Sequence, residues 1–164
     1  MDAAARRAEL DAITPPTKLS PRLRAVVDAL PLRPDSRVLE IGCGPGAAAR
    51  AVAARLTTGR ILAIDRSAAA VAQARAAAAD EIASGGMEFR QVAAEEFVLQ
   101  PGEAPYDLVF AVGVGALDGR HPKAGERALQ RIALATTANA RLFIDGGNPL
   151  RELPIPKAIG PPVR

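Results

Sequence analysis

The sequence predicts an α/β fold with a doubly wound, mostly parallel five-stranded sheet and helices on both faces. Short apolar runs alternate with alanine-rich segments of helical character, the pattern that parallel strands joined by crossover helices require. The first apolar run passes directly into a tight glycine turn at residues 42–46, and a helix begins there. The second run ends in the carboxylate of Asp65. Together these features place a ligand across the carboxyl ends of two neighbouring strands.

Periodicity and end signals define the expected elements. Alanines and mixed charges predict a helix over 2–12, and Ser20 and Pro21 predict the N-cap and first residue of a second helix that ends before Pro31. Ser67 is expected to cap a later helix. Further helices are expected at 47–56, 67–82 and 123–137. Strands are expected at 37–41, 60–64, 87–92, 107–112 and 141–145.

Length and composition indicate one domain with a reducing, cytoplasmic location. The 164 residues suit a single domain, with an N-terminal helix and linker over 1–20 and a proline-rich tail over 149–164. The net charge of +3 comes with no cluster of lysine or arginine, which argues against nucleic acid as a partner. No stretch reaches the length of a membrane span, and the charged first residues lack the apolar core of a signal peptide. The single cysteine excludes an internal disulfide, and no spacing of metal ligands occurs.

Glycine recurs at every second position in the turn after Glu40. This rhythm, with Asp65 after the second strand and Tyr106-Asp107 at the start of the fourth, resembles motif I and its partners in the class I S-adenosylmethionine-dependent methyltransferases. The resemblance extends over roughly residues 20–147. It implies a Rossmann-like sheet of order 3-2-1-4-5, S-adenosyl-L-methionine as the cofactor, and methyl transfer as the activity.

The resemblance also implies roles for particular residues. Asp65 would hold both ribose hydroxyls, the segment after the third strand would contact the adenine, and the far end of the fourth strand would face the methyl group. Glu40 would order the loop or reach the cofactor's ammonium group through water, and Arg66 either borders the adenine or is a surface arginine. The expected cofactor-binding residues are Glu40, Gly42, Cys43, Gly44, Gly46, Asp65, Arg66, Ala93, Ala94, Glu95, Ala111 and Val112. Cys43 is expected to be a small buried filler and not a nucleophile.

Two alternatives remain open at this point. The segment 42–47 also fits the G-x-G-x-x-A pattern of an NAD(P)-binding Rossmann protein, although Glu40 and the position of Gly46 favour the methyltransferase. A non-catalytic or accessory subunit is favoured by two departures from the family. Ala93 stands where the family often has aspartate, and the stretch after Asp145 is too short for the family's antiparallel strands six and seven. The fifth strand would then need the tail or a second subunit at its edge, so a homodimer is also expected.

The methyl acceptor is expected beside the loop at 113–121. No Asn-Pro-Pro-Tyr signature of nucleic-acid methyltransferases follows the fourth strand, so a small-molecule acceptor is predicted. In-line displacement at a sulfonium depends largely on proximity and orientation, although a hydroxyl or amine acceptor needs a base. His121, the only histidine, and Asp118 are the catalytic candidates, beside their commoner roles at a helix start and in a loop turn. Asp145 and Asn148 are interpreted as turn residues that border the acceptor cleft.

Overall fold

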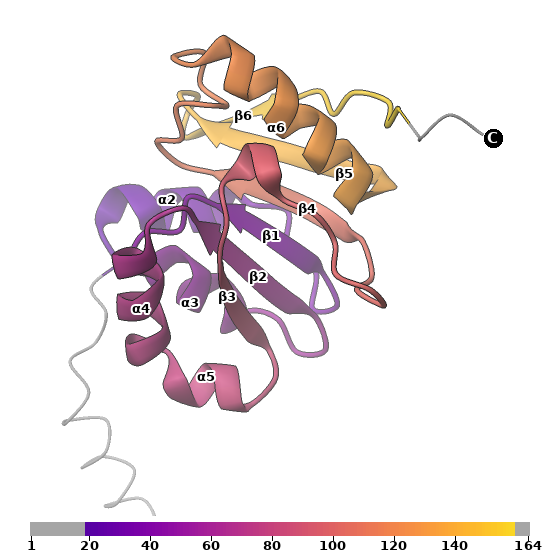
Figure 1. The fold of residues 1–164 in the computed structure, drawn as a ribbon. Coiled ribbons are helices and arrows are strands. Elements are labelled where there is room, and N and C mark those ends of the chain that lie inside the picture. The colour runs from indigo at the N-terminus through magenta and orange to yellow at the C-terminus, as the bar shows by residue number, and fades with distance from the viewer. Residues whose placement is uncertain (1–18, 160–164) are drawn as a thin grey trace, which may run out of the picture.

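The structure, a computed structural model, describes residues 19–159 and contains a six-stranded sheet of order β3-β2-β1-β4-β5-β6 (Figure 1). The strands are β1 (Arg37–Ile41), β2 (Arg60–Asp65), β3 (Met87–Gln91), β4 (Tyr106–Ala111), β5 (Thr136–Asp145) and β6 (Leu150–Leu153). All pairs are parallel except β5 with β6. The expected order of the first five strands is confirmed, and the expected total of five is one too few.

Helices cover both faces of the sheet, as the sequence predicts. They are α2 (Pro21–Ala29), α3 (Ala47–Ala53), α4 (Ala68–Ala77), α5 (Ala79–Ala83) and α6 (Pro122–Ala135), with a 3-10 turn η1 (Ala94–Glu96). Because side chains alternate along a strand, Val38 packs with α2, α3 and α4, whereas its neighbour Leu39 packs with η1 and α6. Both expected caps are present, since Ser20 Oγ accepts from the Leu23 N–H and Ser67 Oγ from the Ala70 N–H. The helix expected at 2–12 lies outside the described residues.

The main correction concerns the segment after Asp145, which was expected to be a proline-rich tail too short for further strands, with this tail or a second subunit at the edge of the fifth strand. Its residues 150–153 form β6, which runs antiparallel to β5 and is tied to it by the ion pair of Arg141 with Glu152 at 2.9 Å. The sequence pattern does not indicate this strand, because it occupies only the four residues between Pro149 and Pro154. The edge of β5 is therefore covered by the chain itself. The homodimer stays a prediction, which light scattering after size-exclusion chromatography would test.

Three expected helices are shorter than their sequence patterns suggest. The helix expected over 47–56 ends at Ala53. The helix expected to reach residue 137 ends at Ala135, and β5 begins at once with Thr136, whose β-branched side chain favours extended backbone. Thr136 Oγ1 donates to the carbonyl of Ile132 at 2.7 Å and so closes the helix. The helix expected over 67–82 is divided at Ala78, where φ is −113°. Two acidic residues in the first turn of α5 stabilise the new helix start.

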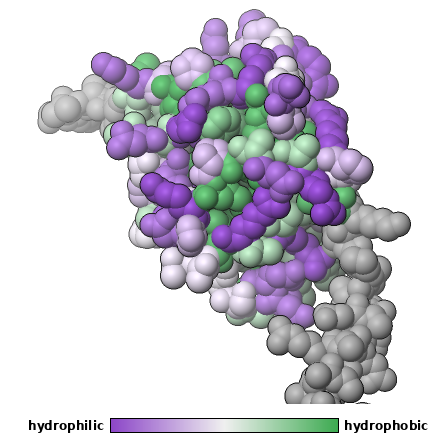
Figure 2. All heavy atoms as spheres, turned by 180° about the vertical axis from the view of Figure 1, so that it is seen from behind, coloured by the Kyte–Doolittle hydropathy of each residue, from purple (hydrophilic) through white to green (hydrophobic). Residues whose placement is uncertain are grey.

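Most large apolar side chains are covered by the chain itself. The face turned away from the viewer in Figure 1 carries apolar side chains mainly toward its middle, with hydrophilic ones around them (Figure 2). Within residues 19–159, the large hydrophobic residues with exposed side chains are Val98, Leu134 and Ile159. In the same part of the chain, no helix has the length and apolar character needed to cross a membrane.

Candidate functional site

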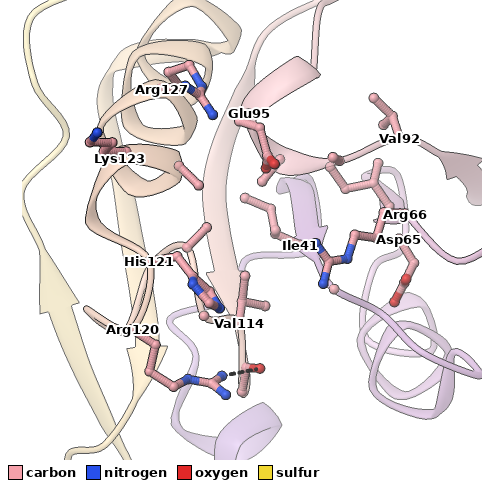
Figure 3. Close-up of a pocket in the computed structure, with 18 of the residues that line it drawn as sticks. Ile41, Asp65, Arg66, Val92, Glu95, Val114, Arg120, His121, Lys123 and Arg127 are labelled. Carbon is pink, nitrogen blue, oxygen red and sulfur yellow. Dashed lines mark hydrogen bonds between the residues drawn. The ribbon is translucent and has the colours of Figure 1, made fainter.

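A cavity of about 1000 Å³ opens at the carboxyl ends of β1, β2 and β4 (Figure 3). Its lining comes from five places in the sequence, namely 41–42, 64–66, 92–95, 112–116 and the start of α6. Ligands of doubly wound sheets bind at this edge, where the connections leave the strands in opposite directions. The cavity therefore lies where the sequence predicts the cofactor.

The glycine turn after β1 reaches the cavity at Gly42. The N–H groups of Gly42 and Cys43 both donate to the carbonyl of Ile64, at 2.8 and 3.0 Å, which ties the turn to the end of β2. Gly44 has φ +52°, and a Cβ added there would meet nothing within 4 Å. Gly46 has φ +89°, and a Cβ there would lie 2.8 Å from the ring of Phe89. Gly44 thus borders open space, whereas Gly46 allows close packing of the turn on the sheet.

Asp65 links the glycine turn to the next helix. Its Oδ2 accepts from the N–H of Gly44, and its Oδ1 accepts from the N–H of Ser67, both at 2.9 Å. The residue also lines the cavity. A carboxylate has about four acceptor positions, so two remain for donors of a ligand. Asp65 is therefore an acceptor held in a fixed position at the cavity wall.

Glu40 lies in β1, two residues before the glycine turn, and does not line the cavity. It is 4% exposed, and its Oε2 has no hydrogen-bond partner among residues 19–159. Burial, and secondarily the charge of Asp65, raises the pKa of the Glu40 carboxyl to about 8. The group is thus mainly protonated at neutral pH. A buried acceptor without a partner fits a ligand that reaches it through water.

Replacing Glu40 with glutamine is expected to remove a pH dependence of stability. The pKa near 8 in the folded chain exceeds the 4.5 of an unburied glutamate, so the folded state keeps a proton that the unfolded chain loses. The contribution of the protonated Glu40 to the stability of the folded state is fully present below about pH 4.5. It is lost as the pH rises through 8. The wild type should lose about 3 kcal/mol of unfolding free energy between pH 5.5 and 8.5, relative to Glu40→Gln. Urea titrations at both pH values measure this, and the exposed Glu96→Gln should behave as the wild type.

The other expected cofactor residues fall into two groups. Gly42, Asp65, Arg66, Ala93, Ala94, Glu95 and Val112 line the cavity. Cys43, Gly44, Gly46 and Ala111 are not part of the lining. Burial raises the pKa of the Cys43 thiol to about 12, which keeps it protonated and agrees with a filler role. Figure 3 shows the guanidinium of Arg66 extending from the end of β2 toward Ile41.

The loop between β4 and α6 folds back on itself beside the cavity. The carbonyl of Val114 accepts from two N–H groups, those of Leu117 and Asp118, and the carbonyl of Gly115 accepts from the N–H of His121. Of the two catalytic candidates in this loop, His121 lines the cavity and Asp118 does not. Asp118 is held by the guanidinium of Arg120 at 2.8 Å, which lowers the pKa of its carboxyl. Catalytic roles for His121 and Asp118 stay predictions.

Asp145 and Asp107, two aspartates that the sequence analysis singled out, have structural roles. Asp145, at the end of β5, accepts from the N–H of Gly113 at 3.0 Å and pairs with Arg22, so it anchors the loop to α2. The Asp107 carboxylate accepts from the N–H of Arg37 at 3.1 Å, at the amino end of the sheet. Asp107 thus ties β1 to β4 on the side away from the cavity.

Sequence reasoning missed three cations that line the cavity, Arg120, Lys123 and Arg127. The arginines look scattered in the sequence, and nothing local marks these ones. A usable signal existed in the four-residue spacing of Lys123 and Arg127, because such residues share one helix face. That helix starts just past the end of β4, where the ligand site was already expected.

Comparison with known proteins agrees with this geometry. The methyltransferase domain family matches residues 38–138. Trans-aconitate 2-methyltransferase of Streptomyces avermitilis is 38% identical over 89 residues, which are 54% of this chain and 32% of that protein. The chain thus spans about a third of the length of this relative.

Solved structures share the fold. The [4+2]-cyclase SpnF superposes with a TM-score of 0.62 at 24% identity, over 74% of this chain and 42% of that one. Coclaurine N-methyltransferase bound to N-methylheliamine and SAH superposes with a TM-score of 0.61 at 19% identity, over 74% of this chain and 34% of that one. These likenesses concern the fold alone. The family match covers more than half of the chain, which therefore belongs to the methyltransferase domain family, in its class I, S-adenosylmethionine-dependent form.

Proposed function

We propose that this chain binds S-adenosyl-L-methionine and transfers its methyl group to a small molecule. The observation that carries the proposal is Asp65, whose carboxylate is fixed at the cavity wall by the N–H groups of Gly44 and Ser67. It has free acceptor positions, and the space beside Gly44 is open. Family membership supports the same cofactor, as does the fold shared with an N-methyltransferase bound to SAH.

The cavity residues suit the parts of this cofactor. Asp65 would accept from the two ribose hydroxyls, and the backbone of Ala93 and Ala94, with Glu95 beside it, would border the adenine. Glu40 is buried outside the lining of the cavity, so its unpartnered Oε2 would meet the ammonium group only through water. When bound, the cofactor supplies a methyl group on a positively charged sulfur. The protein's part is then to exclude water and to orient the acceptor at the end of β4.

The size of the cavity supports a small acceptor. Pockets for single drug-sized ligands run from about 300 to 1000 Å³, and this one is at the upper end of that range. It leaves room for an acceptor beside the cofactor. The relative trans-aconitate 2-methyltransferase is named for a small acceptor, trans-aconitate.

Calorimetry on the wild-type chain tests the cofactor assignment. Titration with S-adenosylmethionine and S-adenosylhomocysteine should give saturable binding at one site, and NAD(H) should give none. Binding of NAD(H) in place of the sulfonium pair would instead support the NAD(P)-binding alternative. A chain that binds the cofactor but forms no S-adenosylhomocysteine with any acceptor would support the accessory subunit.

A further inference from the structure

The wall of the cavity formed by residues 113–127 carries only positive charge. Arg120, Lys123 and Arg127 line it, and no aspartate or glutamate of this segment does. Arg120 is bound to Asp118 and to the carbonyl of Gly113. In contrast, Lys123 and Arg127 have no ion pair or side-chain hydrogen bond with any residue of 19–159. Two cations at this wall therefore have no counter-charge of their own.

The start of α6 adds to this positive field. The helix begins at Pro122 after His121, with no side-chain cap and no acidic residue in its first turn. The first N–H groups of a helix lack partners within it, and its N-terminus carries a partial positive charge. Pro122, Lys123 and Ala124 from this turn line the cavity. The helix end and the two cations thus act on the same space.

The opposite wall does not neutralise this charge. Its carboxylates are Asp65, which already accepts two backbone N–H groups, and Glu95 on η1. In Figure 3, Arg127 extends from α6 toward Glu95 across the cavity, whereas the ammonium group of Lys123 lies at the outer side of the same helix. The cofactor carries a sulfonium and an ammonium group against one carboxylate, so its net charge is positive. A positive wall therefore favours a different, anionic ligand over the cofactor as a whole.

We infer that the methyl acceptor is a small organic acid with at least two carboxylates. This inference rests on the proposed methyl transfer. Arg127 binds one carboxylate through paired N–H donors, with Lys123 beside it at the rim. The second carboxylate faces the methyl group at the end of β4. One of its oxygens uses a lone pair to form the new O–CH₃ bond, while the S–CH₃ bond breaks and its electron pair stays on sulfur. The product is a methyl ester.

This chemistry needs no general base. Carboxyl groups have pKa values near 4, so the acceptor is already ionised at neutral pH, and no proton leaves during the transfer. The described part of the cavity offers one neutral-pH base by residue type, His121. For an acid acceptor, His121 is then a contact residue of the wall and need not carry a proton.

Calorimetry in saturating S-adenosylhomocysteine tests the acceptor class. The probes are succinate, citrate and trans-aconitate, with succinamide as the uncharged match for succinate. We expect at least one of the acids to bind at least about tenfold more tightly than succinamide, because a hydrogen bond to a charged group contributes about 1.5–3 kcal/mol. Arg127→Gln and the double variant with Lys123→Gln should weaken acid binding about tenfold or more. Arg131→Gln removes the same charge from the same helix outside the lining and should change it less than about twofold.

Several results would overturn the inference while leaving the proposed function intact. These are binding of S-adenosylhomocysteine without binding of any acid, or equal binding of succinamide and acids. A third is equal weakening of acid and S-adenosylhomocysteine in the Arg127→Gln variant, which would assign this arginine to the cofactor. Failure of the wild type to bind S-adenosylhomocysteine would overturn the proposed function, and with it the acceptor.

Discussion

Asp65→Ala is expected to weaken the binding of S-adenosylhomocysteine about 100-fold. In the structure, Asp65 fixes the glycine turn through the N–H of Gly44 and starts α4 through the N–H of Ser67. In the complex it would also accept from two ribose hydroxyls. Each hydrogen bond to a charged group contributes about 1.5–3 kcal/mol, so the loss of two corresponds to about 3 kcal/mol or more. Calorimetry with the wild type and the variant measures the change.

The folding cost of this substitution must be separated from its effect on binding. Asp107→Asn is a suitable control, because Asp107 also accepts from a backbone N–H but lies at the amino end of β4, away from the cavity. It should lower the melting temperature while changing S-adenosylhomocysteine affinity less than about twofold. Asp65→Asn keeps the shape but loses the charge, so its affinity should lie between those of wild type and Asp65→Ala. Unchanged binding in Asp65→Ala would remove the central support for the proposed cofactor.

The parts of the site that the sequence predicted are the local ones. The glycine turn, Asp65 and the Ser67 cap lie within one strand–helix–strand unit, and their hydrogen bonds join residues that this unit brings together. The strand order follows from the same alternation of strand and helix, because crossovers in parallel sheets have one hand. Local residue types therefore sufficed for the parallel sheet and for placing Asp65 at the cavity, while the cofactor roles stay predictions.

The parts that were missed depend on packing between distant segments. β6 is four residues long, and among residues 19–159 it pairs only with β5. Without knowledge of that edge, the prolines around it indicate a loop. In the same way, Lys123 and Arg127 become cavity residues only because α6 lies against η1, a neighbour about thirty residues earlier in the chain. The position of a charged residue in the sequence does not show whether its side chain faces a cavity or the outer surface.

Alanine at Gly46 should mainly reduce stability, whereas alanine at Gly44 should mainly reduce ligand binding. Gly46→Ala is expected to lower the unfolding free energy by about 3 kcal/mol, from about 1–2 kcal/mol for the left-handed backbone and a similar overpacking cost. Its φ is +89°, and the new Cβ would lie 2.8 Å from the ring of Phe89 and 3.1 Å from Cβ of Ala74. Phe89 is buried and cannot easily move aside.

Gly44→Ala should cost only the backbone term of about 1 kcal/mol, because a Cβ there meets nothing within 4 Å. That same Cβ would occupy the open space beside Asp65, so S-adenosylhomocysteine binding should fall at least about tenfold in this variant. Urea unfolding and calorimetry on both variants separate the two roles. Equal stability of the two variants would contradict the packing role of Gly46, and full affinity in Gly44→Ala would place the ligand away from the turn. If both results hold, the alternation of glycines serves two purposes: Gly44 admits the ligand, and Gly46 lets the turn approach the sheet.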